Sequence, residues 1–114
     1  MDFFYVKIPW SAALAARERL IHETLESALQ AAGAGSLLGW GRSLAAGGRV
    51  GYQRIDIEVS AAALAGPALR QALVGLDAPA GTELHYPRDG RALQEDYDGT
   101  AWLAPRPSTG AGRR

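Results

Sequence analysis

The chain has 114 residues, of which 47% are hydrophobic, and its 12 basic residues balance its 12 acidic ones. This length suits a single domain with a modest core, and the hydrophobic content excludes an intrinsically disordered chain. A formal net charge of zero provides no overall attraction to nucleic-acid phosphates or anionic membranes. The absence of cysteine excludes disulfides, thiol nucleophiles and cysteine-based zinc sites.

The first ten residues, MDFFYVKIPW, lack the basic start, the apolar run and the small-residue cleavage site of a signal peptide. No apolar run in the sequence approaches the roughly 20 residues that span a bilayer. We therefore expect a cytoplasmic protein that does not bind a membrane. The richness in Ala, Gly and Arg is typical of a bacterial protein from a GC-rich genome.

Residues 2–8, DFFYVKI, are rich in aromatic and β-branched side chains and predict a first strand, which Pro9 ends. Successive side chains of a strand point to opposite faces. One face of this strand is therefore apolar and the other is mixed, with Phe4, Val6 and Ile8 on the first and Phe3, Tyr5 and Lys7 on the second.

A helical pattern covers residues 12–32, with Ser11 as its N-cap and Gly33 as its C-terminal stop. Its apolar stripe has helical spacing and comprises Leu14, Ile21, Leu25, Ala28, Leu29 and Ala32. His22 falls off this stripe, so we expect it on the exposed side of the helix in a surface pair with Glu18.

Residues 36–44 and 50–59 predict two antiparallel strands joined by a hairpin turn at 45–49. Glycines inside the first strand, Gly39 and Gly41, favour a bulge or a close backbone approach. This glycine-rich segment has two interpretations that the sequence does not separate. One is a ligand loop or adjustable edge strand, and the other is a bulged edge strand that resists edge pairing.

The strand at 50–59 alternates apolar and charged side chains, so its two faces have opposite character. The apolar face predicts contact with a core, and the charged face points away from it. These two sets are Ile55, Ile57 and Val59, and Arg54, Asp56 and Glu58.

A second helix is expected to begin at Pro67, because proline is favoured at the first helical position. Its apolar face comprises Leu69, Ala72, Leu73 and Leu76. A loop at 77–81 then leads to a strand at 82–86, and an Asp-Gly turn returns residues 92–95, ALQE, as a short fifth strand. In the strand at 82–86, Leu84 and Tyr86 should point inward, and Glu83 and His85 outward.

The order strand, helix, strand, strand, helix, strand predicts an α+β, ferredoxin-like βαββαβ fold. Its antiparallel sheet would have the order 4-1-3-2, with two helices on one face and the other face open. We expect a single domain over 1–103, with Trp102 anchoring its end. A disordered tail is expected over 104–114, which is rich in Pro, Gly and Ser. The open face predicts an interaction surface made of Phe3, Tyr5, Lys7, Trp40, Arg54, Asp56, Glu58 and His85.

The open face is poorly suited to nucleic acid, although RNA-recognition modules share this topology and stack bases on aromatic side chains of the equivalent strands. Asp56 and Glu58 lie where such aromatics would be needed, and their carboxylates repel a phosphate chain. We therefore expect no nucleic-acid partner.

A catalytic interpretation would use His85 with Asp56 or Glu58 as an acid–base set. The sequence has no nucleophile motif, no paired-histidine metal spacing and no phosphate-binding glycine loop. Cross-strand ion pairs on a solvated or partner-covered face are the favoured interpretation of these charges. We accordingly expect no catalytic residues, no cofactor and no metal. Asp98-Gly99 predicts a turn rather than a calcium loop, because further oxygen ligands are missing.

The segments YQRIDIEV, LRQALVGLDAPAGTELHY and LQEDYDG together resemble a set of small uncharacterised bacterial proteins. In these a third strand, a Leu-rich helix, a GAP-x-GT type loop and a short strand recur in that order. The resemblance covers roughly residues 36–99, and the loop here reads LDAPAGT at 76–82. It implies no activity, so no site residue is carried over. Such proteins sometimes prove to be immunity proteins that neutralise a toxin, although those are often more acidic than this chain.

The sequence therefore favours a noncatalytic module that binds a protein partner, which includes a second copy of the chain. The binding surface would be the open sheet face or the glycine-rich edge, because aromatic groups among charges of both signs suit a protein contact. The alternatives are an immunity or antitoxin-like protein, and a small enzyme that uses His85 with Asp56 or Glu58.

Overall fold

The computed structural model describes residues 2–44 and 50–108, and these form an α+β fold. In chain order the elements are β1 (Asp2–Pro9), α1 (Ala12–Ala15), α2 (Glu18–Ala32), β2 (Gly35–Leu44), β3 (Val50–Val59), α3 (Ala62–Gly75), β4 (Glu83–Arg88), β5 (Arg91–Asp96) and β6 (Arg106–Pro107). The predicted hairpin turn at 45–49 lies outside the described residues.

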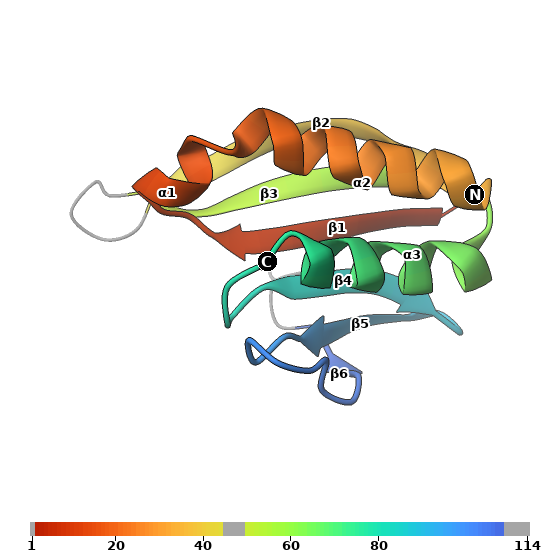
Figure 1. Ribbon diagram of the computed structural model, residues 1–114. Helices are drawn as coiled ribbons and strands as arrows, with labels where there is room; N and C mark the ends of the chain where they lie inside the picture. Colours follow the sequence, from red (N-terminus) through yellow and green to blue (C-terminus); the bar gives the residue numbers. More distant parts are fainter. Residues whose placement is uncertain (1, 45–49, 109–114) are drawn as a thin grey trace.

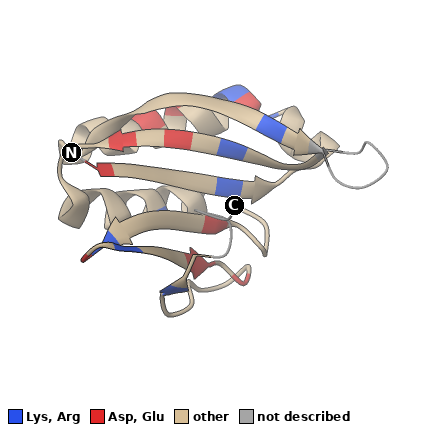
Figure 2. Cartoon of the chain, turned by 180° about the vertical axis from the view of Figure 1, so that it is seen from behind, with Lys and Arg blue, Asp and Glu red and all other residues tan. Residues whose placement is uncertain are grey.

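The three helices lie on one face of a six-stranded antiparallel sheet (Figure 1). The opposite face carries no helix in the described chain, and Figure 2 shows the sheet from that side. Apolar side chains of β1 and β3 meet those of α2 and α3 to form the core, as the alternating patterns predict. Fully buried members include Val6, Ile55, Ile57, Leu25, Leu29, Leu69 and Leu73.

The strand order is β2-β3-β1-β4-β5-β6, so the predicted order 4-1-3-2 does not match the whole sheet. The strands β4, β1, β3 and β2 are neighbours in it, and β5 and β6 extend the sheet beyond β4. The expected strand at 92–95 is found as β5. It follows a tight turn in which Asp89 and Gly90 have positive φ angles of 52° and 78°, as Asp-Gly hairpins do.

The first predicted helix has the expected ends but is divided in two. The Ser11 side chain caps α1 by accepting the Leu14 N–H at 3.3 Å, and Gly33 ends α2 in a left-handed conformation with φ 65°. The break between α1 and α2 includes Arg17, whose guanidinium donates to the Leu76 carbonyl oxygen at 2.9 Å. A tertiary contact thus accompanies the break, and the periodic pattern alone does not reveal it.

The predicted start of the second helix at Pro67 is wrong, because α3 begins at Ala62 and Pro67 lies inside it. A proline lacks a backbone N–H and cannot donate to the carbonyl one turn earlier. The alanine-rich stretch before it favours the helix nevertheless, and Ala65 packs into the core with no exposed surface. Packing therefore outweighs the local preference of proline for a first turn.

Part of the predicted disordered tail, 104–114, has a defined place in the structure. Within it, Arg106–Pro107 forms β6 and pairs with Leu93 and Gln94 of β5. The Arg106 guanidinium also donates to a carboxylate oxygen of Asp96 at 2.6 Å. This strand is held by polar contacts rather than by an apolar pattern, which explains why composition suggests disorder. Residues 109–114 lie outside the described residues.

The bulge expected in the glycine-rich strand is present, as a register shift between Leu37 and Gly39. Leu37 pairs with Ile57, but after the shift Trp40 pairs with Ile55. A bulge inserts one residue and exchanges the faces of those that follow. Trp40 is thereby moved to the helix-covered side, where its ring lies 4.0 Å from that of His22.

Candidate functional site

The open face collects seven of the eight residues predicted for the interaction surface, and Trp40 is the exception. Directly paired residues of antiparallel strands share a face. The seven lie in three rows across β3, β1 and β4, which are Glu58 with Phe3, Asp56 with Tyr5 and His85, and Arg54 with Lys7. Glu83, which was not predicted for this surface, completes the third row beside Lys7. Trp40 is among the residues around a hollow of this face, but the bulge turns its side chain to the helix-covered side, where its ring lies beside that of His22 on α2.

A hollow of about 630 Å³ lies over β1, β2 and β3 on the open face. Its lining includes Phe3, Tyr5, Leu38, Tyr52, Arg54 and Asp56. Two apolar side chains project most strongly here, because Phe3 is 61% exposed and Leu38 is 55% exposed. Sequence reasoning missed Leu38 and Tyr52. The alternation along β2 indicates Leu38, because Leu37 before it pairs with the core-facing Ile57 and the next residue points to the opposite face.

The charged groups in the centre of the open face are already engaged with neighbours. Arg54 donates to Asp56 at 2.7 Å and lies over the Tyr5 ring at 3.8 Å. The Lys7 ammonium is 3.8 Å from Glu83 and 4.2 Å from the centroid of the Tyr52 ring. Of these two ion pairs, the one between Lys7 and Glu83 crosses between strands, whereas Arg54 and Asp56 lie on the same strand. Cross-strand pairing is therefore found for Lys7, with Glu83 as its partner in place of Asp56 or Glu58. Glu58 has no ion pair among the described residues.

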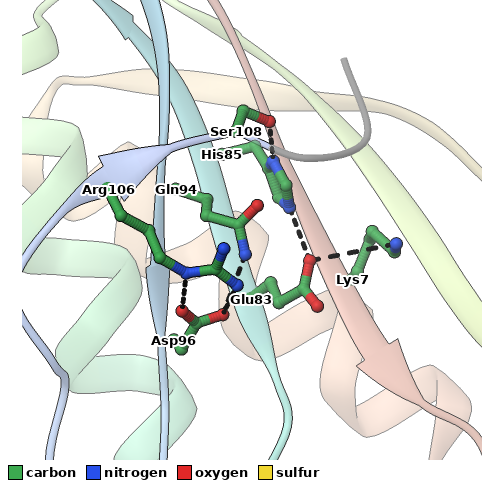
Figure 3. Close-up of polar contacts among 7 residues, drawn as sticks. All are labelled: Lys7, Glu83, His85, Gln94, Asp96, Arg106 and Ser108. Carbon is green, nitrogen blue, oxygen red and sulfur yellow. Dashed lines mark hydrogen bonds and ion pairs between the residues drawn. The ribbon is translucent and has the colours of Figure 1, made fainter. Parts of the chain in front are cut away.

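His85 points to the open face, as predicted, but it is only 2% exposed. The Tyr5 ring stacks on its imidazole at 4.2 Å and 9°. Its Nε2 lies 2.7 Å from a Glu83 oxygen, and its Nδ1 lies 2.6 Å from the Ser108 hydroxyl (Figure 3). The carboxylate partner of His85 is therefore Glu83, and the proposed sets with Asp56 or Glu58 are not in contact with it.

These contacts determine the protonation state of the imidazole. Burial lowers the pKa of His85 and outweighs the opposing effect of Glu83, so the ring is neutral at pH 7. A carboxylate only accepts hydrogen bonds, so Nε2–H donates to Glu83. Nδ1 is then the ring acceptor, and the Ser108 hydroxyl donates to it.

A second polar group holds the end of the sheet beside His85. Asp96 accepts hydrogen bonds from Arg106 at 2.6 Å and from Gln94 at 2.9 Å (Figure 3). The hydrogen bond from Arg106 lowers the pKa of Asp96. The Ser108 backbone N–H donates to the Ala92 carbonyl oxygen at 2.9 Å. Ser108 is therefore positioned by both its backbone and its side chain, which composition did not predict.

The helix-covered side of the sheet has its own polar cluster around Glu95. Arg70 donates two hydrogen bonds to this carboxylate at 2.7 and 2.8 Å, and the Tyr86 hydroxyl donates a third. Burial alone would raise the pKa of Glu95, but the hydrogen bonds from Arg70 and Tyr86 lower it. Because these donors and the acceptor satisfy one another, the cluster is a structural element of the fold.

The predicted surface pair of His22 with Glu18 is wrong, since His22 is only 7% exposed. Its Nε2 instead lies 2.8 Å from Oε1 of Gln53, a buried residue of β3. Gln53 in turn donates to Glu18, so the two predicted partners are linked through a third side chain. The sequence did not reveal this, because Gln53 occupies a core-facing position of an otherwise apolar set.

The Asp98-Gly99 segment is a closed turn, as predicted. One Asp98 oxygen accepts the backbone N–H groups of Thr100 and Ala101, each at 2.7 Å. These hydrogen bonds lower the pKa of Asp98. Over residues 2–44 and 50–108, no group of three acidic or histidine side chains is arranged to hold a metal ion.

No family model, curated protein or solved structure matches this chain. In the part of the chain that the structure describes, no helix is long and apolar enough to cross a membrane.

Proposed function

We propose that this chain is a protein-interaction module whose open sheet face binds a second copy of itself. The observation that carries the proposal is the hollow over β1, β2 and β3, in which Phe3 and Leu38 are more than half exposed. Exposed apolar and aromatic groups that lie among charged groups are typical of protein interfaces.

The charges of this face favour a protein over a nucleic acid. Lys7 and Arg54 are both occupied by carboxylates and by aromatic rings. A phosphate chain would have to displace Glu83 and Asp56 from them and would also meet Glu58. A protein surface can instead pack on the tyrosine rings while the existing ion pairs remain in place.

The order of charges along the strands favours a second copy as the partner. On the open face of β3, the basic Arg54 is followed by the acidic Asp56 and Glu58. On β1 the basic Lys7 lies beside Arg54, so one end of the face is basic and the other acidic (Figure 2). A two-fold axis across the strands reverses their direction in the partner. With the axis at the row of Asp56, the Glu58 row of each subunit lies over the Arg54 and Lys7 row of the other, which is the self-complementarity that such an axis requires.

The size of the face predicts a weak, reversible dimer. A strand of eight residues spans about 26 Å and four neighbouring strands span about 19 Å, so the face offers on the order of 500 Å² per subunit. Two such faces bury about 1,000 Å², at the low end of specific interfaces. Association should therefore depend on concentration within the range that sedimentation experiments cover.

Sedimentation velocity over a concentration series, up to millimolar chain, tests the proposal. The wild-type chain should shift from monomer to dimer, and Phe3→Glu should remain a monomer because it places an unpaired charge in the contact. Leu64→Glu is the matched control, since Leu64 is a 52% exposed leucine on α3, away from the open face. A wild-type monomer at every concentration would overturn self-association, and a Phe3→Glu dimer as stable as that of wild type would overturn its assignment to the open face.

Glu58→Lys adds a test of the charge arrangement itself. This substitution turns an acidic row basic and should weaken the dimer, with a larger effect at low salt because exposed charges are screened. A wild-type dimer whose dissociation constant does not change with salt concentration would argue against the two-fold arrangement.

The alternative is that the open face binds a different protein, such as the toxin that an immunity protein neutralises. Monomeric wild type together with tight binding of such a toxin to this face would favour that alternative. We also propose that β1 to β4 and the helices form a ferredoxin-like unit. The proposal extends to a relationship with the small bacterial proteins described above and to a cytoplasmic location.

A further inference from the structure

The open face holds a second feature, next to the hollow over β1 to β3 and sharing Phe3 and Tyr5 with it. Ser108, His85 and Glu83 form a chain of hydrogen bonds in which the hydroxyl donates to Nδ1 and Nε2–H donates to the carboxylate. The distances of 2.6 and 2.7 Å are those of a nucleophile held by its general base and of a base held by an orienting acid. We infer that Ser108 is an activated nucleophile, which small activated esters with a short apolar acyl group acylate.

The hydrogen bonds assign the roles of orienting acid to Glu83 and of general base to His85, and these roles do not depend on which ring nitrogen faces the hydroxyl. Glu83 holds the proton on Nε2, and this leaves Nδ1 as a base facing the hydroxyl. The stacked Tyr5 ring fixes the plane of the imidazole at 4.2 Å. His85 therefore cannot turn to exchange its two nitrogens without losing both partners.

Ser108 is accessible although His85 beneath it is buried. The hydroxyl is on a half-buried residue that lines an adjoining hollow of about 280 Å³. Phe3, Tyr5, Pro87 and Leu93 form most of its apolar wall, with His85 at its base. This volume is small for a ligand site. The wall chemistry selects an uncharged apolar group, and the size limits it to a short one.

The reaction needs only the ester and water. Ser108 Oγ attacks the ester carbonyl carbon while its proton moves to Nδ1 of His85. The carbon–oxygen bond to the leaving group then breaks, and the alcohol departs with that proton, leaving an acyl-serine. Water attacks the acyl-serine with His85 again taking a proton, and Ser108 leaves as the hydroxyl while the carboxylic acid is released.

The acylation rate should be modest, because the backbone N–H of the nucleophile, a usual hydrogen-bond donor to the oxyanion, already has another partner. The Ser108 backbone N–H donates to the Ala92 carbonyl at 2.9 Å and so does not stabilise an oxyanion. A missing oxyanion donor costs about 10²–10³ in rate, whereas a positioned general base contributes about 10²–10⁴. The missing donor slows both acylation and deacylation, but an activated ester has a better leaving group than the acyl-serine, so we expect the acyl-serine to form faster than water removes it and to accumulate.

The experiment is incubation of the full chain with p-nitrophenyl acetate, followed by intact mass measurement and peptide mapping. Wild type should gain one acetyl group on Ser108 and release one equivalent of p-nitrophenol. Ser108→Ala should lose that modified peptide, and Ser27→Ala, an exposed serine of α2, should keep it. Acetylation only at amines, or equal modification of the Ser108→Ala chain, would overturn the inference.

Two further readouts separate an activated serine from one that merely fixes β6 to the sheet. His85→Gln should slow acylation by about 10²–10⁴, with folding checked by circular dichroism. If that variant fails to fold, the pH profile of wild type decides. Acylation should rise with pH to a plateau through a midpoint below 6.5, because the pKa of His85 lies below that ordinary value. The titratable groups facing His85 are Glu83, Lys7, Tyr5 and Asp96. An acylation rate that does not change with pH below 6.5 would contradict the assignment of His85 as the base.

Discussion

The two faces of the sheet use polar side chains in different ways. On the helix-covered face, Glu95 accepts three hydrogen bonds from Arg70 and Tyr86, and its side chain is only 6% exposed. On the open face, Arg54 and Asp56 are about half exposed and pair with each other across 2.7 Å. The first cluster is required by burial, whereas the second leaves a face whose apolar groups remain available to a partner.

The sharpest contrast lies between two neighbours on β1. Phe4 is 3% exposed and packs against Tyr86, with the two rings 5.5 Å apart, and Phe3 is 61% exposed. Phe4→Ala should lower the free energy of unfolding by about 3–5 kcal/mol. Phe3→Ala should change it by about 0.5 kcal/mol or less. Urea unfolding at low protein concentration measures both, and equal losses would contradict the assignment of the two faces.

The next contrast concerns the two arginine pairs. Arg70→Ala leaves the Glu95 carboxylate buried without its main partner, and we expect a loss of about 2–3 kcal/mol. This lies below the range for fully buried pairs because the Arg70 side chain is itself 27% exposed. Arg54→Ala removes an exposed pair and should cost about 0.2–1 kcal/mol. A larger effect at Arg54 than at Arg70, again by urea unfolding, would reverse the comparison.

The smallest of these effects is a dependence on pH. The pKa of Glu95 is lowered in the folded chain from an ordinary value of 4.5, because the hydrogen bonds from Arg70 and Tyr86 outweigh burial. Its contribution to stability is therefore complete above pH 4.5 and is lost as the pH falls through the folded pKa. The stability difference between wild type and Glu95→Gln should shrink on acidification over this range. A difference that stays constant from pH 6 to about 3 would contradict the linkage.

Much of the open face could be predicted from the sequence, because it depends on a period of two. The alternation along β1 and β3 places Tyr5, Asp56 and Arg54 on one side without any knowledge of their partners. Trp40 could not be placed the same way. A bulge shifts the alternation by one residue, and the sequence indicates that a bulge occurs but not at which residue.

The contacts of β6 and of the two histidines could not be predicted, for a different reason. Ser108 reaches His85, and Gln53 reaches His22, across large separations in the chain. No local pattern encodes these pairings, since they depend on how β5 and α2 pack. The sequence indicated that His85 faces outward, but not that Ser108 lies above it.

The central claim is that the open face is an interface between copies of this chain. Sedimentation velocity of wild type and Phe3→Glu over the same concentration series tests it most directly. The account predicts a concentration-dependent dimer for wild type, a monomer for Phe3→Glu and an unchanged dimer for the Leu64→Glu control. A wild-type chain that sediments as a monomer up to millimolar concentration would contradict it.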